Sequence, residues 1–157
     1  MNQTENIDKL KTFRALRIEC LKAKRQIKSL ADKTARSAAL LAAEKRKQFP
    51  HLHNFMTEEG LALNREKIEA KKIKLKEDEA RLKELLGEIS AFLKTVGDQE
   101  IKETIELYYI DGMSYPQVAE CMGALGDGTT QMKRLKRWFK RHIASAPSHL
   151  SSPNREG

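Results

Sequence analysis

Basic side chains are concentrated in one short stretch near the C-terminus. Six of the nine residues from 133 to 141 are lysine or arginine: Lys133, Arg134, Lys136, Arg137, Lys140 and Arg141. In an α-helix, which turns about 100° per residue, they would surround an inward stripe formed by Met132, Leu135 and Phe139. No acidic residue lies between Asp127 and Glu156. Because lysine and arginine bind phosphate oxygens, the stretch predicts a helix that binds a polyanion such as DNA.

A short helix and a glycine turn are expected immediately before this basic helix. Ser114-Tyr-Pro-Gln117 is a capping box, with proline in the first turn where its missing N–H is harmless. Val118, Ala119 and Met122 would face inward, and Gly123 would close the helix. A capped helix, a turn and a basic helix together are typical of a helix-turn-helix, whose second helix enters the DNA major groove.

Two alternatives concern single features of this region. A basic helix by itself is often only a solvated surface, so the capped helix upstream is what favours DNA binding. Trp138 could pack beneath the first helix of the motif or lie against a sugar-phosphate edge, and we expect packing.

Two long helices must support this motif. Residues 5–47 contain no glycine or proline, and small or apolar residues recur there at alternating spacings of three and four: Phe13, Leu16, Cys20, Ala23, Ile27, Leu30 and Leu41, with Thr34 and Ser37 in the remaining positions. Beyond a loop at 48–60, a seven-residue repeat follows: Leu61, Ile68, Leu75, Leu82, Ile89 and Val96. These repeats predict helices from about Ile7 to Lys47 and from Leu61 to Val96.

The second helix has a second set of seam positions, three residues after each residue of the repeat. They are apolar in its later half and polar in its earlier half. Leu85 and Phe92 fill them late in the helix, whereas Asn64, Lys71 and Asp78 fill them early. Such helices suit an antiparallel hairpin within one chain, a coiled coil between chains, or both. Because a lone helix with an exposed apolar seam is marginal in water, we expect a homo-oligomer, most simply a dimer.

The remaining chain completes an all-α fold, a long helical hairpin or coiled coil followed by a C-terminal helix-turn-helix. Asp98 is a plausible N-cap for an acidic helix that ends at the turn Asp111-Gly112. After Ile143 the sequence is rich in serine and proline. We therefore predict three parts: 1–97 for oligomerisation, 98–143 for DNA binding and 144–157 as a disordered tail.

Charge and cysteine content limit the protein class. The 157 residues carry a net charge of +8, unevenly placed, with one Lys or Arg against seven Asp and Glu in 98–128 and seven against one in 129–157. Cys20 and Cys121 are far apart, as in a reduced cytoplasmic protein. With neither a signal peptide nor an apolar run of about 20 residues, we expect a cytoplasmic protein without membrane contact.

No pattern indicates an enzyme, a cofactor or a metal site. His51 and His53 could supply two metal ligands, but no cysteine or acidic cluster stands nearby at ligand spacing. Cys121 has no adjacent base, and Gly126-Asp-Gly128 follows no predicted strand as a phosphate loop would.

Residues 107–123, Leu-Tyr-Tyr-Ile-Asp-Gly-Met-Ser-Tyr-Pro-Gln-Val-Ala-Glu-Cys-Met-Gly, resemble the sigma-70 region-four type of helix-turn-helix. The whole layout resembles small phage or prophage transcriptional regulators, including the RinA/ArpU-like late activators. This resemblance implies that Ser114 and Tyr115 begin the supporting helix near the phosphates. It places further contacts on the recognition helix, at Thr129, Thr130 and Gln131 and at the basic residues named above. The turn departs from the family pattern, because residues 124–128 are an insertion that either lengthens it or forms a small wing.

The leading hypothesis is therefore a sequence-specific, phage-type transcriptional regulator that binds double-stranded DNA, with RNA polymerase or another phage or host protein as a further partner. A second hypothesis is a small terminase-like DNA-packaging component. The order of the parts, with the DNA-binding motif after the oligomerisation helices, argues mildly against it. A third is an interaction or inhibitor protein whose basic helix binds an acidic protein surface.

Overall fold

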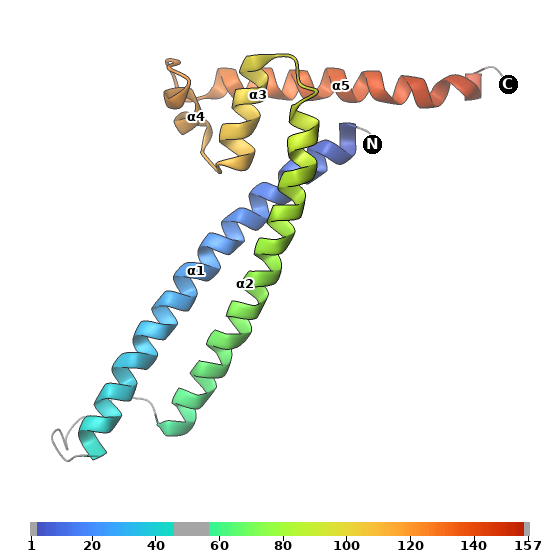
Figure 1. Cartoon of the computed structure of the whole chain (residues 1–157). Helices are drawn as coiled ribbons and strands as arrows, with labels where there is room; N and C mark the ends of the chain where they lie inside the picture. The colour runs from blue at the N-terminus through green and yellow to red at the C-terminus, as the bar shows by residue number, and fades with distance from the viewer. Residues whose placement is uncertain (1–2, 46–56, 156–157) are drawn as a thin grey trace. The chain divides into compact units, whose positions relative to one another are not determined.

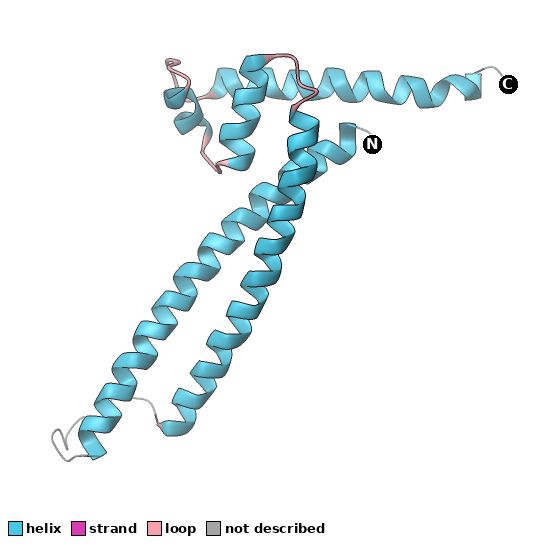
Figure 2. Cartoon of the chain, viewed as in Figure 1, coloured by secondary structure: helices cyan, strands magenta, loops and turns pink. Residues whose placement is uncertain are grey.

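A computed structural model describes the backbone of residues 3–45 and 57–155, and the surroundings of side chains in 4–43 and 57–142. Every regular element in these residues is helical (Figure 2), which confirms the all-α prediction for them. The elements in Figure 1 are α1 (Gln3–Lys45), α2 (Glu58–Leu93), α3 (Gln99–Ile105), the π-helix η1 (Glu106–Ile110), α4 (Tyr115–Cys121) and α5 (Thr129–Arg155). Most of the loop predicted at 48–60 lies outside the described residues, and α2 begins at Glu58, three residues before the predicted start at Leu61.

The chain divides into two compact units. Residues 19–81 form one, here called the hairpin unit, and residues 1–18 with 82–157 form the other, here called the core unit. This differs from the predicted boundary at residue 97. The physical reason is that the first turns of α1 and the last turns of α2 carry large apolar residues that pack with α3 and α5 in one cluster.

In the hairpin unit, α1 and α2 lie side by side and run in opposite directions (Figure 1). Their seam positions are the least exposed, and the buried ones include Cys20, Thr34 and Ser37 on α1 and Leu61, Asn64 and Ile68 on α2. Asn64 Nδ2 donates a hydrogen bond to Thr34 Oγ1 at 3.4 Å. Each helix thus lies along the seam of the other within one chain, while the seam residues Ile27, Leu30 and Leu75 remain half-buried.

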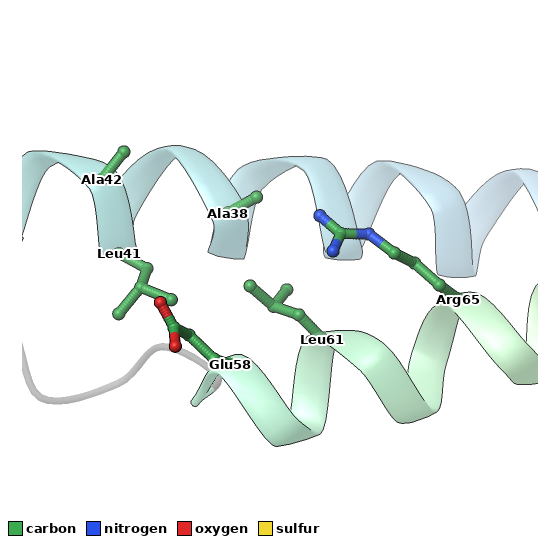
Figure 3. Close-up of a pocket in the computed structure, with 6 residues that line it drawn as sticks. All are labelled: Ala38, Leu41, Ala42, Glu58, Leu61 and Arg65. Atoms are coloured by element: carbon green, nitrogen blue, oxygen red, sulfur yellow. The ribbon is translucent and has the colours of Figure 1, made fainter.

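A recess of about 310 Å³ lies between the two helices of the hairpin unit, near the end of α1 and the start of α2. Figure 3 shows its six lining residues, three from each helix: Ala38, Leu41, Ala42, Glu58, Leu61 and Arg65. Two of the three residues from α1 are alanines, whose small side chains leave this volume unfilled.

The core unit is organised around one apolar cluster that draws on α1, α2, α3, η1 and α5. Leu10 and Ile105 are completely buried, and Leu85, Ile89 and Leu135 are nearly so. The full set is Ile7, Leu10, Phe13, Leu85, Ile89, Phe92, Leu93, Val96, Ile101, Ile105, Tyr109, Leu135, Trp138 and Phe139. Removal of this apolar surface from water is the main driving force for bringing the helices together.

Two arginines of α1 bind the end of η1. Arg14 Nε donates to the carbonyl of Tyr108 at 3.1 Å, and Arg17 Nη1 donates to the carbonyl of Ile110 at 3.1 Å. The Arg14 guanidinium also lies 4.2 Å from the centroid of the Tyr108 ring. Carbonyls at a helix C-terminus lack intrahelical partners and carry partial negative charge, so both contacts are favourable.

The predicted helix from Asp98 differs in its last turn. Asp98 does cap it, accepting from the backbone N–H groups of Glu100 and Ile101. From Glu106 the bonding widens, since the Asp111 N–H donates to the Glu106 carbonyl at 2.8 Å. Such π-turns insert one extra residue into a helix, and here the wider turn presents the carbonyls that the two arginines bind.

The last helix also ends later than expected. We predicted no regular structure after Ile143, whereas α5 continues to Arg155. No glycine occurs in 129–155, so the most common signal for a helix end is absent from this stretch.

Replacement of Arg14 tests its contacts with η1. We expect Arg14→Leu to lower the free energy of unfolding by about 1–3 kcal/mol, because it removes a charged hydrogen bond and a cation–π contact. Urea unfolding followed by circular dichroism would measure this. Lys11→Leu, which removes an exposed cation of the same helix, is the control, and equal losses for both variants would contradict the role given to Arg14.

Candidate nucleic-acid interface

The outer face of α5 is basic and exposed. All six predicted cations, Lys133, Arg134, Lys136, Arg137, Lys140 and Arg141, are exposed to solvent. Leu135, Trp138 and Phe139 lie on the opposite side, in the apolar cluster. Lys133 and Arg137 point most directly away from that cluster, because each lies two residues, or about 200°, from Leu135. The helix therefore presents cations outward while its other side is fixed.

The capping box predicted before α5 is present at the start of α4. The Ser114 N–H donates to Gln117 Oε1 at 2.9 Å, and the Gln117 N–H donates to Ser114 Oγ at 3.4 Å. Ser114 is exposed, as expected for a residue near a ligand, although its hydroxyl is already bonded within the cap. Val118 and Ala119 are fully buried, which confirms the predicted inward face for these two residues.

The turn between α4 and α5 is shaped by glycines. Gly123, Gly126 and Gly128 all have positive φ angles, of 69°, 105° and 89°. The Ala124 N–H donates to the Ala119 carbonyl at 2.8 Å, which closes α4 as a Schellman motif. Residues with side chains rarely adopt these angles, so the glycines fix the path of the inserted turn.

Gly128 anchors this turn against the start of α4. A Cβ atom at this position would lie 2.1 Å from the Tyr115 carbonyl oxygen, so the two backbones touch where only glycine fits. α4 and α5 also pack against each other. The insertion at 124–128 is therefore a turn with a defined path, and its last residue carries the contact between the two helices.

The side chain of Asp127 accepts hydrogen bonds at the start of α5. Its Oδ1 accepts from the Thr129 N–H at 3.0 Å and from the Thr129 hydroxyl. These two hydrogen bonds lower the pKa of the Asp127 carboxyl below its usual range. The capping oxygen thus comes from Asp127, and Thr129 is the first helical residue, with Thr130 exposed beside it.

Tyr115 is only partly available at the proposed surface. Its ring stacks on Tyr108 with centroids 4.1 Å apart and planes 13° apart, on the ring that Arg14 also contacts. Burial raises the pKa of its hydroxyl, so the residue stays neutral. Tyr115 thus positions α4 through its ring and offers at most one edge to a ligand.

Gln131 does not belong to the exposed surface, which corrects its assignment from the sequence. The side chain is 7% exposed, and its Oε1 has no hydrogen-bond partner among the described residues. Gln131 lies four residues, one helical turn, before the buried Leu135, so the helix directs it inward.

Trp138 packs inside, as expected. Its ring lies 6.3 Å from Phe92 and 5.7 Å from Phe139 between centroids, so it contacts α2 as well as its own helix. His142 stacks on it at 3.8 Å, and His142 Nδ1 lies 2.8 Å from the Trp138 carbonyl, to which it must donate. His142 lies within α5 and not at its end.

One cation of α5 is already paired. Arg134 Nη1 lies 2.7 Å from Glu100 Oε2 on α3, and both side chains are more than half exposed. Glu100 stands 34 positions away, and no sequence pattern connected the two. Since exposed ion pairs contribute about 0–1 kcal/mol, the pair restrains Arg134 weakly and can be exchanged for another anion.

The described residues contain no group of three or more His, Cys, Asp or Glu side chains placed to hold a metal ion. His51 and His53 lie outside them. Cys20 is buried, which raises the pKa of its thiol, and Cys121 is exposed with its Sγ 3.6 Å from Met113 Sδ. Among the described helices, none has the length and apolar character needed to cross a bilayer.

Comparison with protein-family models, curated proteins and solved structures gives no match for this chain. The sigma-like resemblance of residues 107–123 therefore remains a prediction. The geometry offers an outward-facing basic helix, a short capped helix beside it and a glycine-defined turn between them.

The contact between Gly128 and Tyr115 can be tested by adding one methyl group. We expect Gly128→Ala to lower the free energy of unfolding by about 2–4 kcal/mol, because backbone strain combines with a backbone clash. Gly123→Ala introduces similar strain with nothing within 4 Å of the new Cβ, and should cost about 1 kcal/mol. Thermal unfolding would compare the two, and a Gly123→Ala loss as large as that of Gly128→Ala would refute the contact.

Proposed function

We propose that this protein is a sequence-specific transcriptional regulator of the phage type, which binds double-stranded DNA through a helix-turn-helix formed by α4, the turn and α5. The observation that carries the proposal is the division of α5 into two sides. One side exposes six cations, and the other contributes Leu135, Trp138 and Phe139 to the apolar cluster. A helix fixed in this way can enter a major groove without losing its packing.

The groups on α5 divide by the kind of contact that they suit. Lys133, Arg137 and Lys140 on the outermost face suit phosphates or base edges, and Lys136 and Arg141 flank them. Thr129 and Thr130, at the first turn, lie where recognition helices read bases. Arginine and lysine contacts with phosphates would supply most of the affinity and make it strongly dependent on salt.

A homodimer remains part of the proposal, now for a different reason. Because α1 and α2 of one chain already pair along the seam, a dimer would use the half-buried seam positions or another surface. Its advantage would be two motifs on spaced half-sites, since linked modules bind far more tightly than either alone. RNA polymerase is the protein partner expected from the sigma-like resemblance.

The basic face can be tested by removing its two most outward cations. We expect Lys133→Ala with Arg137→Ala to weaken binding to a duplex of the protein's genomic target site by tenfold or more. The slope of log K against log salt should fall by about two, since each lost phosphate contact removes about 0.9. Fluorescence anisotropy across a salt series would measure both quantities.

The matched control is Lys67→Ala with Lys76→Ala, which removes the same charge from exposed positions on α2. We expect this control to change affinity less than threefold. Equal effects of the two pairs would mean that total charge, not α5, determines binding. A wild-type protein that retards no DNA at low salt would exclude the proposed function.

The pair between Glu100 and Arg134 gives a second test. We expect Glu100→Gln to tighten DNA binding about twofold to fivefold, because Arg134 then no longer has to exchange a carboxylate for a phosphate. Glu103→Gln removes the same charge from an exposed position on the same helix and should have a smaller effect. In an Arg134→Ala background the two variants should become equal, and a difference that persists there would contradict the exchange.

A further inference from the structure

A second basic site lies in the hairpin unit, apart from the residues of the α4–α5 interface. It is a shallow recess of about 360 Å³ lined by Gln26, Ser29, Leu30 and Lys33 of α1 and by Lys71 of α2. Two of these side chains are cations, two carry neutral hydrogen-bond donors, and none is acidic. Like charges that share a recess repel each other, so the site favours an anion between them.

Lys71 lines this recess from a seam position of α2. It occupies a seam position of α2, one heptad after Asn64 and between the apolar seam residues Ile68 and Leu75, and it is half-buried. A lysine in such a position buries its aliphatic stem and directs its ammonium toward an opening. The recess is such an opening. Lys71, which interrupts the apolar seam, therefore supplies a hydrogen-bond donor to it.

Two acids near Lys71, Glu19 and Asp78, line a different recess. Lys71 and Gln26 also border a neighbouring recess that includes Glu19 and Asp78. Asp78 Oδ2 lies 3.2 Å from Lys74 Nζ, which satisfies its charge locally. Neither Lys33 nor Lys71 has an ion pair among the described residues. Their charges are therefore available to a ligand.

The helix that carries the recess is itself basic. Between residues 19 and 43, α1 has six lysines and arginines, namely Lys22, Lys24, Arg25, Lys28, Lys33 and Arg36, against Glu19 and Asp32. All six are exposed, and Lys24 is the one that pairs with an acid, Glu79 at 3.4 Å. This excess extends a positive field over the recess and its surroundings, which increases the local concentration of polyanions.

We propose that this recess binds a phosphate group of a nucleic-acid backbone, as a sequence-independent contact made by the hairpin unit in addition to the α4–α5 interface. The two ammonium groups neutralise the phosphate, while the Gln26 amide and the Ser29 hydroxyl donate hydrogen bonds to its oxygens. The assignment of the phosphate to DNA rests on the proposed function. The affinity of the recess for phosphate does not.

The test combines Lys33→Gln with Lys71→Gln and uses a 20-base-pair duplex of random sequence. The salt slope should fall by about 0.9, because one bound phosphate is lost, with several-fold weaker binding. The control Lys67→Gln with Lys76→Gln removes equal charge outside the recess and should leave the slope nearly unchanged. Equal slopes for the two double variants would overturn the proposal. Lys33→Gln alone, at an exposed position outside the seam, should lower the slope in the same direction by less than about 0.9, with the helix content by circular dichroism unchanged.

Backbone amide shifts in NMR separate this proposal from the proposed function. Titration of the full chain with the random duplex should shift the amides of Ser29 and Lys33, and inorganic phosphate should shift the same amides more weakly. Shifts with phosphate but not with DNA would overturn the assignment to nucleic acid and leave a site for free phosphate. DNA retention without any shift in 26–33 would overturn the recess while leaving the α4–α5 interface in place.

Discussion

The interaction on which the candidate interface depends is the binding of two η1 carbonyls by Arg14 and Arg17. It fixes the widened turn that carries Tyr108, and the Tyr108 ring supports Tyr115, the first residue of α4. The Tyr115 carbonyl in turn touches Gly128, immediately before α5. The basic helix is thus positioned through a continuous series of contacts that begins in the first turns of the chain.

The helices themselves could be predicted because seven-residue repeats and capping residues are local signals. The division into units could not. A repeat shows that a helix has an apolar face, but not which surface covers it, and Phe13 and Leu16 share the three-and-four spacing of the hairpin residues. Only the apolar cluster that they join in the folded chain assigns them to the core unit.

The candidate site shows the same limit at the level of single residues. Charge alone identified the exposed cations of α5, since a helix with one apolar stripe must expose the rest. Gln131 was misassigned because its polar side chain suggested exposure, although its spacing of four residues from Leu135 places it on the inward face. Glu100 was missed as the partner of Arg134 because the pair is made by the packing of α3 on α5, not by spacing along the chain.

The hydrogen bond between Asn64 and Thr34 has a consequence for the alignment of the two long helices. Apolar layers in a heptad pattern tolerate a slide of seven residues, about 10 Å along the axis, because one aliphatic residue replaces another. A slide of α2 by one heptad would place Asn64 opposite Ile27 or Leu41 and break its hydrogen bond with Thr34. The pair therefore specifies the register of α1 and α2. It replaces some apolar contact, and it favours one alignment of the hairpin unit over those shifted by seven residues.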